Sequence, residues 1–400
     1  MPQPTRPSVL SLRIVVPLFG LTQIIAWGSL FYSVAVLARP MADDLGLDIT
    51  TVFAAFSASL GVSGLCSPWL GRAIDRRGGS AVLSAGSLIS AGALALIALA
   101  QGPLLFFLGW VLAGVAMAAN LYDAAFAVLS QFSGTRYRQA LTALTLFGGF
   151  ASTVFWPLAW HLHEGHGWRV ALGVFAVMHI AICLPIHRLV LPQGTTPPPD
   201  PTPPATPPAR PDRGRRFWWL AAAFTLCSFV ISAMAAHGVG ALQASGLDAG
   251  TAIFVAALIG PMQVVGRALE FVLARGVAAS RVGMAAFAVM LAAMGVLWQV
   301  ALAPWLAFVF AIAYGLSNGV MSIVRGTVPA ELFGRDGYGA LMGRLAQPTY
   351  YAKAAAPLLV ALLIGDGGSY QGMALLLIVL AALALGSFAL AVREGDQSND

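Results

Sequence analysis

Twelve apolar stretches, each about long enough to cross a lipid bilayer, constrain the fold of this 400-residue chain more than any other feature. A transmembrane helix needs about 20 mostly apolar residues. Because lipid offers no partner for an exposed backbone N–H or C=O group, each stretch must be helical. We therefore expect an all-α, polytopic membrane protein with twelve transmembrane helices. They occupy residues 12–38, 50–71, 80–100, 103–129, 139–160, 168–190, 217–243, 249–274, 280–301, 303–325, 339–364 and 370–392.

The composition agrees with a lipid-facing surface and narrows the class of protein. Apolar residues make up 58% of the chain and charged residues only 10%, against about 25% charge in soluble domains. The three cysteines are scattered through apolar stretches and predict neither a disulfide framework nor a metal site. The net charge of +6 is expected in connecting loops, with no continuous face for nucleic acid. No nucleotide-binding loop or catalytic triad is apparent, so we expect no enzyme, cofactor or metal.

A proline-rich stretch divides the chain. Ten of the residues from Pro192 to Pro211 are proline, which predicts an extended, semi-rigid linker. We expect an N-terminal six-helix bundle at residues 1–190, a cytoplasmic linker at 191–216 and a C-terminal six-helix bundle at 217–400.

The arginines set the expected orientation. With the N-terminus in the cytoplasm, sixteen arginines fall in inside segments, and only Arg39 and Arg169 fall in outside loops. Positive charge is enriched in cytoplasmic loops. The sequence thus predicts a monomer of the bacterial inner membrane with both termini in the cytoplasm.

The sequence SPWLGRAIDRRGG lies where the second stretch meets the third, on the inside. Gly71 would let two helices approach, Asp75 lies near the start of the next helix, and Arg76, Arg77 and Gly78 predict a tight basic turn. This segment resembles the signature loop of the major facilitator superfamily. The resemblance covers essentially the whole chain, and implies a conformational latch here and two six-helix bundles around a central cavity.

A second segment, GRALE, matches GRAID in letters but not in depth. An Arg-Gly pair follows Arg72 after five residues and Arg267 after eight, which places Arg267 about 12 Å up its helix. The bilayer midplane lies about 15 Å deep. A charge at such depth costs about 3 kcal/mol, so it is expected to face protein or a water-filled cavity.

Two interpretations of Arg267 remain open. Gln263, Arg267 and Glu270 fall on one face of the predicted helix. Glu270 would neutralise Arg267 as a structural pair, or Arg267 would face the substrate.

The chain has one lysine, Lys353, near the middle of the eleventh stretch. It is either a fixed positive charge for an anion or the partner of Asp123 in the fourth stretch. Asp123 itself is either a proton carrier or the partner of a basic residue, because burial disfavours its charged form.

A finer resemblance concerns these cations. The sequence IGPMQVVGR resembles the eighth span of the monocarboxylate transporters, in which an arginine binds the substrate carboxylate; Arg267 matches it. Gln263 replaces the acid of that family. Lys353, in YAKAAAP, matches a lysine of the oxalate/formate antiporter. The resemblance implies that Arg267 and Lys353 hold a carboxylate.

Further polar residues of the spans are candidates for substrate contact. Tyr32, Asn318 and Tyr350 are taken as binding residues, with interior hydrogen bonds or interfacial anchoring as the alternative. The segment HLHEGHGW has metal-like spacing, but a short glycine-rich loop with one acid does not predict a metal site.

These features favour secondary transport of a small organic anion, a mono- or dicarboxylate, by alternating access. Asp123 and Glu270 would provide coupling or gating, with a proton or a counter-anion as the second species. One alternative is efflux of drug-like or amphipathic compounds, which the intramembrane cations disfavour. Another is a ligand sensor or scaffold that does not transport, for which the linker is too short to hold a soluble domain.

Overall fold

The computed structural model describes residues 11–191, 214–274, 276–364 and 370–396, and every regular element within them is helical. Eleven helical segments in this part of the chain are long and apolar enough to span a membrane. The all-α fold expected from the sequence is therefore confirmed. Most of the expected linker, at 192–213, lies outside the described residues, so its boundaries remain a prediction.

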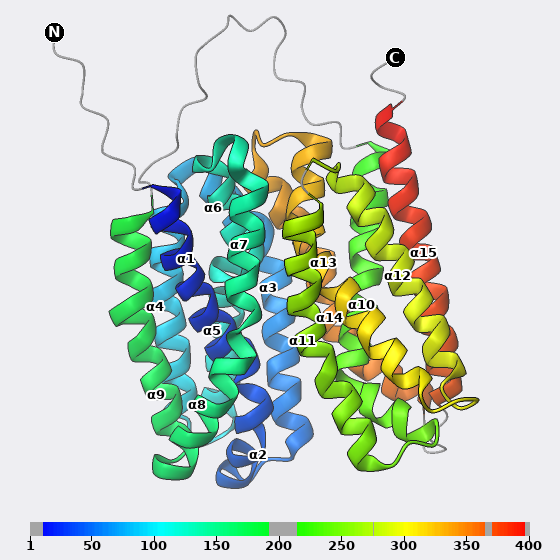
Figure 1. Ribbon diagram of the computed structural model, residues 1–400. Helices are drawn as coiled ribbons and strands as arrows, with labels where there is room; N and C mark the ends of the chain where they lie inside the picture. Colours follow the sequence, from blue (N-terminus) through cyan, green and yellow to red (C-terminus); the bar gives the residue numbers. More distant parts are fainter. Residues whose placement is uncertain (1–10, 192–213, 275, 365–369, 397–400) are drawn as a thin grey trace, which may run out of the picture. The chain divides into compact units, whose positions relative to one another are not determined.

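The chain divides into two compact units, each of which is described by itself (Figure 1). Unit 1 consists of Met1–Val52 and Arg72–Thr196, and unit 2 consists of Phe53–Gly71 and Pro197–Asp400. The middle of the second span thus packs with unit 2, although it belongs to the first half of the sequence.

Unit 1 is built around α1, which packs against α7, and around α4, which packs against α5 and α9. Its elements are α1 (Leu12–Trp27), η1 (Gly28–Tyr32), α2 (Val34–Leu45), both ends of α3 (Ile49–Arg77), α4 (Gly79–Ala98), α5 (Pro103–Asn120), α6 (Tyr122–Phe132), η2 (Gly134–Arg136), α7 (Tyr137–Gly149), α8 (Ala151–His166), α9 (Trp168–Met178), η3 (His179–Cys183) and η4 (Ile186–Val190).

Several spans of unit 1 are interrupted. The fourth span, expected as one helix, breaks at Leu121, whose extended backbone separates α5 from α6. The fifth span bends at Phe150 between α7 and α8. The segments η1, η3 and η4 are π-helical. Such turns inside membrane helices occur frequently at functional sites.

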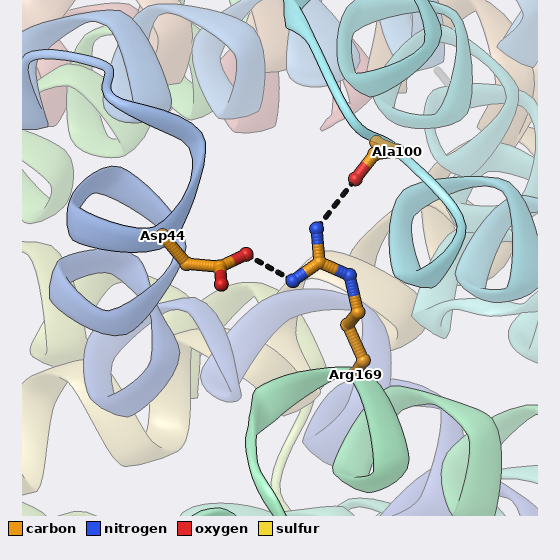
Figure 2. A network of polar contacts seen from close by, with 3 residues as sticks. All are labelled: Asp44, Ala100 and Arg169. Atoms are coloured by element: carbon orange, nitrogen blue, oxygen red, sulfur yellow. Dashed lines mark hydrogen bonds and ion pairs between the residues drawn. The ribbon is translucent and has the colours of Figure 1, made fainter.

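Arg169, at the start of α9, holds one end of unit 1 together (Figure 2). Its guanidinium forms an ion pair with Asp44 of α2 and donates a hydrogen bond of 2.7 Å to the carbonyl of Ala100, after α4. It also lies 4.3 Å from the ring centroid of Trp168. One expected outside arginine therefore joins three separate segments.

Unit 2 is organised around two long helices, α10 and α13. Helix α10 packs against α14 and α15, and α13 packs against α11 and α12. The elements are α10 (Arg215–Ala244), α11 (Ala249–Leu273), α12 (Ala279–Gln299), α13 (Leu306–Phe333), α14 (Tyr338–Ile364) and α15 (Tyr370–Asp396).

The twelfth expected span, 339–364, corresponds to α14. At 27 residues α14 is long enough to cross a bilayer, but it is not one of the eleven sufficiently apolar segments. The reason is its polar middle, which contains Gln347, Thr349 and Lys353. The least apolar helix of unit 2 is thus the one that carries the only lysine of the chain.

Glycines bring two pairs of helices close together in unit 2. A Cβ atom on Gly266 would lie 2.5 Å from the carbonyl oxygen of Leu316, and one on Gly319 would overlap that of Gln263, so α11 and α13 cross closely. A Cβ atom on Gly71 would overlap the carbonyl of Gly339, so α3 and α14 do the same. Small residues allow such crossings in membrane proteins.

We predict that Gly71→Ala destabilises the protein by about 1–3 kcal/mol, the usual cost of overpacking. The new methyl group would meet the backbone of Gly339, which cannot rotate away as a side chain could. Thermal unfolding of the purified protein in detergent measures the effect.

Gly61→Ala in the same helix is the matched control, because no atom lies within 4 Å of its added Cβ. Alanine is the better helix former, so this variant should melt at or above the temperature of the parent protein. Equal melting of the two variants would contradict a close crossing at Gly71.

Candidate functional site

Arg267 lies within α11, six residues before its end at Leu273, or about 9 Å along the helix axis. Its side chain is only 7% exposed. The guanidinium Nε donates a hydrogen bond of 3.1 Å to the hydroxyl of Ser322 in α13. Glu270, one turn further on, is also buried, so both open interpretations of this arginine place it inside the protein.

The neighbouring helix carries a second cation that the sequence analysis missed. Arg325 was placed at the cytoplasmic end of the tenth span, but α13 continues to Phe333, eight residues or about 12 Å further. Its Nη2 donates a hydrogen bond of 2.6 Å to the hydroxyl of Thr349 in α14. The first turn signal after Arg325 is Gly334, and that distance could have revealed its depth.

Lys353 lies in α14, one turn after Thr349. Its ammonium is 5.1 Å from the ring centroid of Tyr350, within range of a cation–π contact. Pro357 has no N–H group to bond the carbonyl of Lys353 four residues earlier. Ser232 of α10 supplies the missing donor at 2.8 Å, which fixes the α14 backbone at the lysine.

The structure thus brings the predicted residues of unit 2 into one neighbourhood. Hydrogen bonds link α11 to α13 through Arg267, and α13 to α14 through Arg325. Both Arg325 and Lys353 act electrostatically on the buried thiol of Cys227 in α10. Further predicted residues lie on the same three helices, namely Gln263 on α11, Asn318 on α13 and Tyr350 on α14.

The predicted residues Tyr32 and Asp123 lie in unit 1. Asp123 is buried in the first turn of α6, directly after the break in the fourth span. Tyr32 packs edge-on against Trp156, whose indole donates to the Tyr32 carbonyl at 3.1 Å. The expected pair of Asp123 with Lys353 would join residues of different units and remains a hypothesis.

Two buried histidines of the sixth span were also missed. The ring of His187 lies 2.8 Å from the hydroxyl of Ser87 in α4 and 3.0 Å from that of Thr22 in α1. His179 lies 2.9 Å from the hydroxyl of Ser29 in η1. Both join spans through neutral partners, and nothing in the spacing of HIAICLPIHR indicates this.

The signature-like segment forms the junction of α3 and α4. Asp75, Arg76 and Arg77 lie in the last turn of α3, and Gly78, with φ at 82°, permits the sharp reversal into α4. A latch function for this turn stays a prediction.

The metal expectation concerns HLHEGHGW. Helix α8 extends to His166, so most of this segment is helical and the expected loop is wrong. Within the described ranges, no three His, Cys, Asp or Glu side chains are grouped as metal ligands.

Comparison with known proteins identifies the architecture. The family model described as Major Facilitator Superfamily matches residues 18–346. No curated protein matches the sequence. Three solved structures are similar over most of their length, and at such low identity they show the fold alone.

The first is the human organic anion transporter TETRAN, with a TM-score of 0.73, 16% identity, and coverage of 96% of this chain and all of the other. The second is a bacterial homologue of the iron transporter ferroportin, with a TM-score of 0.72, 12% identity, and coverage of 94% and 99%. The third is the proton:xylose symporter XylE, with a TM-score of 0.72, 9% identity, and 94% coverage of each chain.

We predict that His187→Ala destabilises the protein by about 1–3 kcal/mol, because the hydroxyls of Thr22 and Ser87 would lose a buried partner. The exposed His166→Ala serves as control and should leave thermal unfolding in detergent unchanged. Equal melting temperatures of the two variants would show that His187 does not hold the spans together.

Proposed function

This chain belongs to the major facilitator superfamily, and on that premise we propose that it transports a small organic anion, a mono- or dicarboxylate, by alternating access. Arg267 and Lys353 attract the carboxylate. The protein resembles the monocarboxylate and oxalate/formate branch in these two positions. The substrate assignment goes beyond the family, whose membership establishes a membrane transporter and not an enzyme.

The observation that carries the proposal is the burial of cations inside unit 2. A charged side chain inside a membrane protein is costly and is retained where it has a function. Arg267 offers a planar pair of donors suited to a carboxylate, whereas Lys353 offers a point charge. Tyr350 beneath the ammonium holds it without neutralising it, because an aromatic ring has no net charge.

The fold does not select the substrate. The similar structures come from proteins described as transporters of organic anions, iron and xylose. Of these, the organic anion transporter agrees with the cations of α11 and α14. An efflux transporter of neutral or cationic compounds would have little use for two buried positive charges.

The coupling species follows from the position of the acids. In the monocarboxylate relatives an acid occupies the position of Gln263, and an amide cannot carry a proton. Coupling therefore falls to Asp123 or Glu270, or the protein exchanges one anion for another. We further propose that it is a monomer of the bacterial inner membrane with cytoplasmic termini, since arginine is concentrated in the segments of one side.

Arg267→Gln should raise the dissociation constant of the carboxylate substrate about ten- to a hundredfold, because a charge-assisted hydrogen bond contributes roughly 1.5–3 kcal/mol. Arg267→Lys should restore binding only in part, since a point charge cannot replace the planar pair of donors. Calorimetric titration of purified protein with a panel of short carboxylates measures both.

Arg281→Gln, an exposed residue of α12, is the control and should bind like the parent protein. If folded Arg267→Gln binds every carboxylate normally, Arg267 is the structural partner of Glu270. Transport of neutral or cationic compounds without competition from any carboxylate would end the anion proposal.

Asp123→Asn should abolish stimulation of uptake by a proton gradient if Asp123 carries the proton. Uptake into vesicles is measured with and without the gradient, and with and without unlabelled anion inside. Stimulation by internal anion alone, unchanged in the variant, would instead establish exchange and exclude Asp123 as the proton carrier.

A further inference from the structure

Arg325 occupies the position between the two cations already assigned to the substrate. Ser322, which accepts from Arg267, lies one turn before Arg325 on α13. Thr349, which accepts from Arg325, lies one turn before Lys353 on α14. The three cations therefore form one row across α11, α13 and α14, joined by two hydroxyl groups.

Both hydroxyls are oriented to accept from arginine. The Ser322 hydroxyl donates its proton to the carbonyl of Gly319 at 2.7 Å, and the Thr349 hydroxyl donates to that of Ala346 at 2.7 Å. Each hydroxyl has one proton, so what remains is acceptor capacity. These hydroxyls thus fix the guanidinium groups and cannot themselves donate to an anion.

Each arginine keeps donors beyond this contact. A guanidinium has five N–H donors in a planar fork. The bond to Ser322 uses the Nε of Arg267, and the bond to Thr349 uses one Nη of Arg325. The contacts described therefore orient the two groups without using up their capacity to bind a carboxylate.

The charges of the three helices do not balance. Helices α11, α13 and α14 contain four cations, Arg267, Arg325, Arg344 and Lys353, against two carboxylates, Glu270 and Glu331. Glu331 caps α12, accepting from the backbone N–H groups of Ala279 and Ser280. Four positive and two negative charges leave an excess of two on these helices.

One carboxylate does not match this row. Along α13 the step from Ser322 to Arg325 is about 4.5 Å, and along α14 the step from Thr349 to Lys353 is about 6 Å. The two oxygens of a single carboxylate share one carbon atom and cannot reach cations on three helices at once. Two carboxylates joined by a short chain can.

We propose that Arg325 is a third substrate-binding residue and that the substrate is a short dicarboxylate, whose second carboxylate Arg325 binds while Arg267 and Lys353 hold the first. This rests on the proposed transport of an organic anion. Thr349 is then a positioning residue, which acts by orienting Arg325.

The test compares diacids with their own monoamides. Oxalate, malonate, succinate and glutarate are each titrated into the purified protein, together with the corresponding monoamide, which keeps the shape and loses one charge. At least one diacid should bind about ten- to a hundredfold more tightly than its monoamide, the worth of a charge-assisted contact.

Arg325→Gln should reduce this preference to less than about threefold while leaving monoamide affinity unchanged. Arg325→Lys, which keeps the charge, should restore part of the preference and covers the case in which the glutamine variant does not fold. Thr349→Val should lower the preference as well, whereas a purely structural threonine would lower both affinities equally.

Arg344→Gln is the matched control, because this arginine of α14 lies over the ring of Phe217 at 5.2 Å and outside the row. It should keep the full preference. Equal binding of diacid and monoamide by the parent protein, with both weakened by Arg267→Gln, would overturn the dicarboxylate but leave anion transport standing. Binding of no acid in the panel would overturn both.

Discussion

The interior of a membrane protein must satisfy its polar groups without help from the lipid, and the binding site follows from that constraint. Pro357 deprives the carbonyl of Lys353 of its helical donor, and Ser232 of α10 replaces it. The hydroxyls of Ser322 and Thr349 return their protons to their own helices. Each thereby becomes an acceptor with a fixed direction, and an arginine from a neighbouring position supplies the matching donor. The orientation of the cations is thus a consequence of hydrogen-bond bookkeeping within the helices.

Glycine makes those short contacts reachable. A serine hydroxyl extends little beyond its helix backbone, so Arg267 can reach Ser322 only where α11 and α13 cross closely. Gly266 and Gly319 provide that crossing, since a Cβ atom at either would meet the backbone of the other helix. Gly71 has the same role between α3 and α14. Packing and chemistry are therefore set by the same positions: an alanine here would move a helix and, with it, the donor that the helix presents.

The sequence predicts the spans because apolar length is a strong signal, and it predicts Arg267 and Lys353 because a charge deep in an apolar stretch has few explanations. Arg325 escaped because the expected span was ended at that residue, although no turn residue occurs before Gly334. The break at Leu121 has no proline or glycine beside it to announce it. His187 could not be found because its role depends on Ser87 and Thr22, which reach it from other helices. Depth along one helix can be read from the chain, but partners across helices cannot.

The two units handle buried polarity in different ways, and the difference has a consequence for selectivity. In unit 1, His179 and His187 pair with hydroxyls, and Gln23 donates to the carbonyl of Asn120 at 2.9 Å, all of which are neutral contacts. Neutral pairs can be completed within the protein and need no ligand. The cations of α11, α13 and α14 outnumber the carboxylates of these helices, and hydroxyls or aromatic rings can orient a cation but cannot cancel its charge. If resident acids cancelled the excess fully, an incoming anion would gain little from entering. A transporter that leaves part of the compensation to its substrate gains affinity for anions and penalises neutral isosteres of the same shape, because they would leave the cations without a counter-charge.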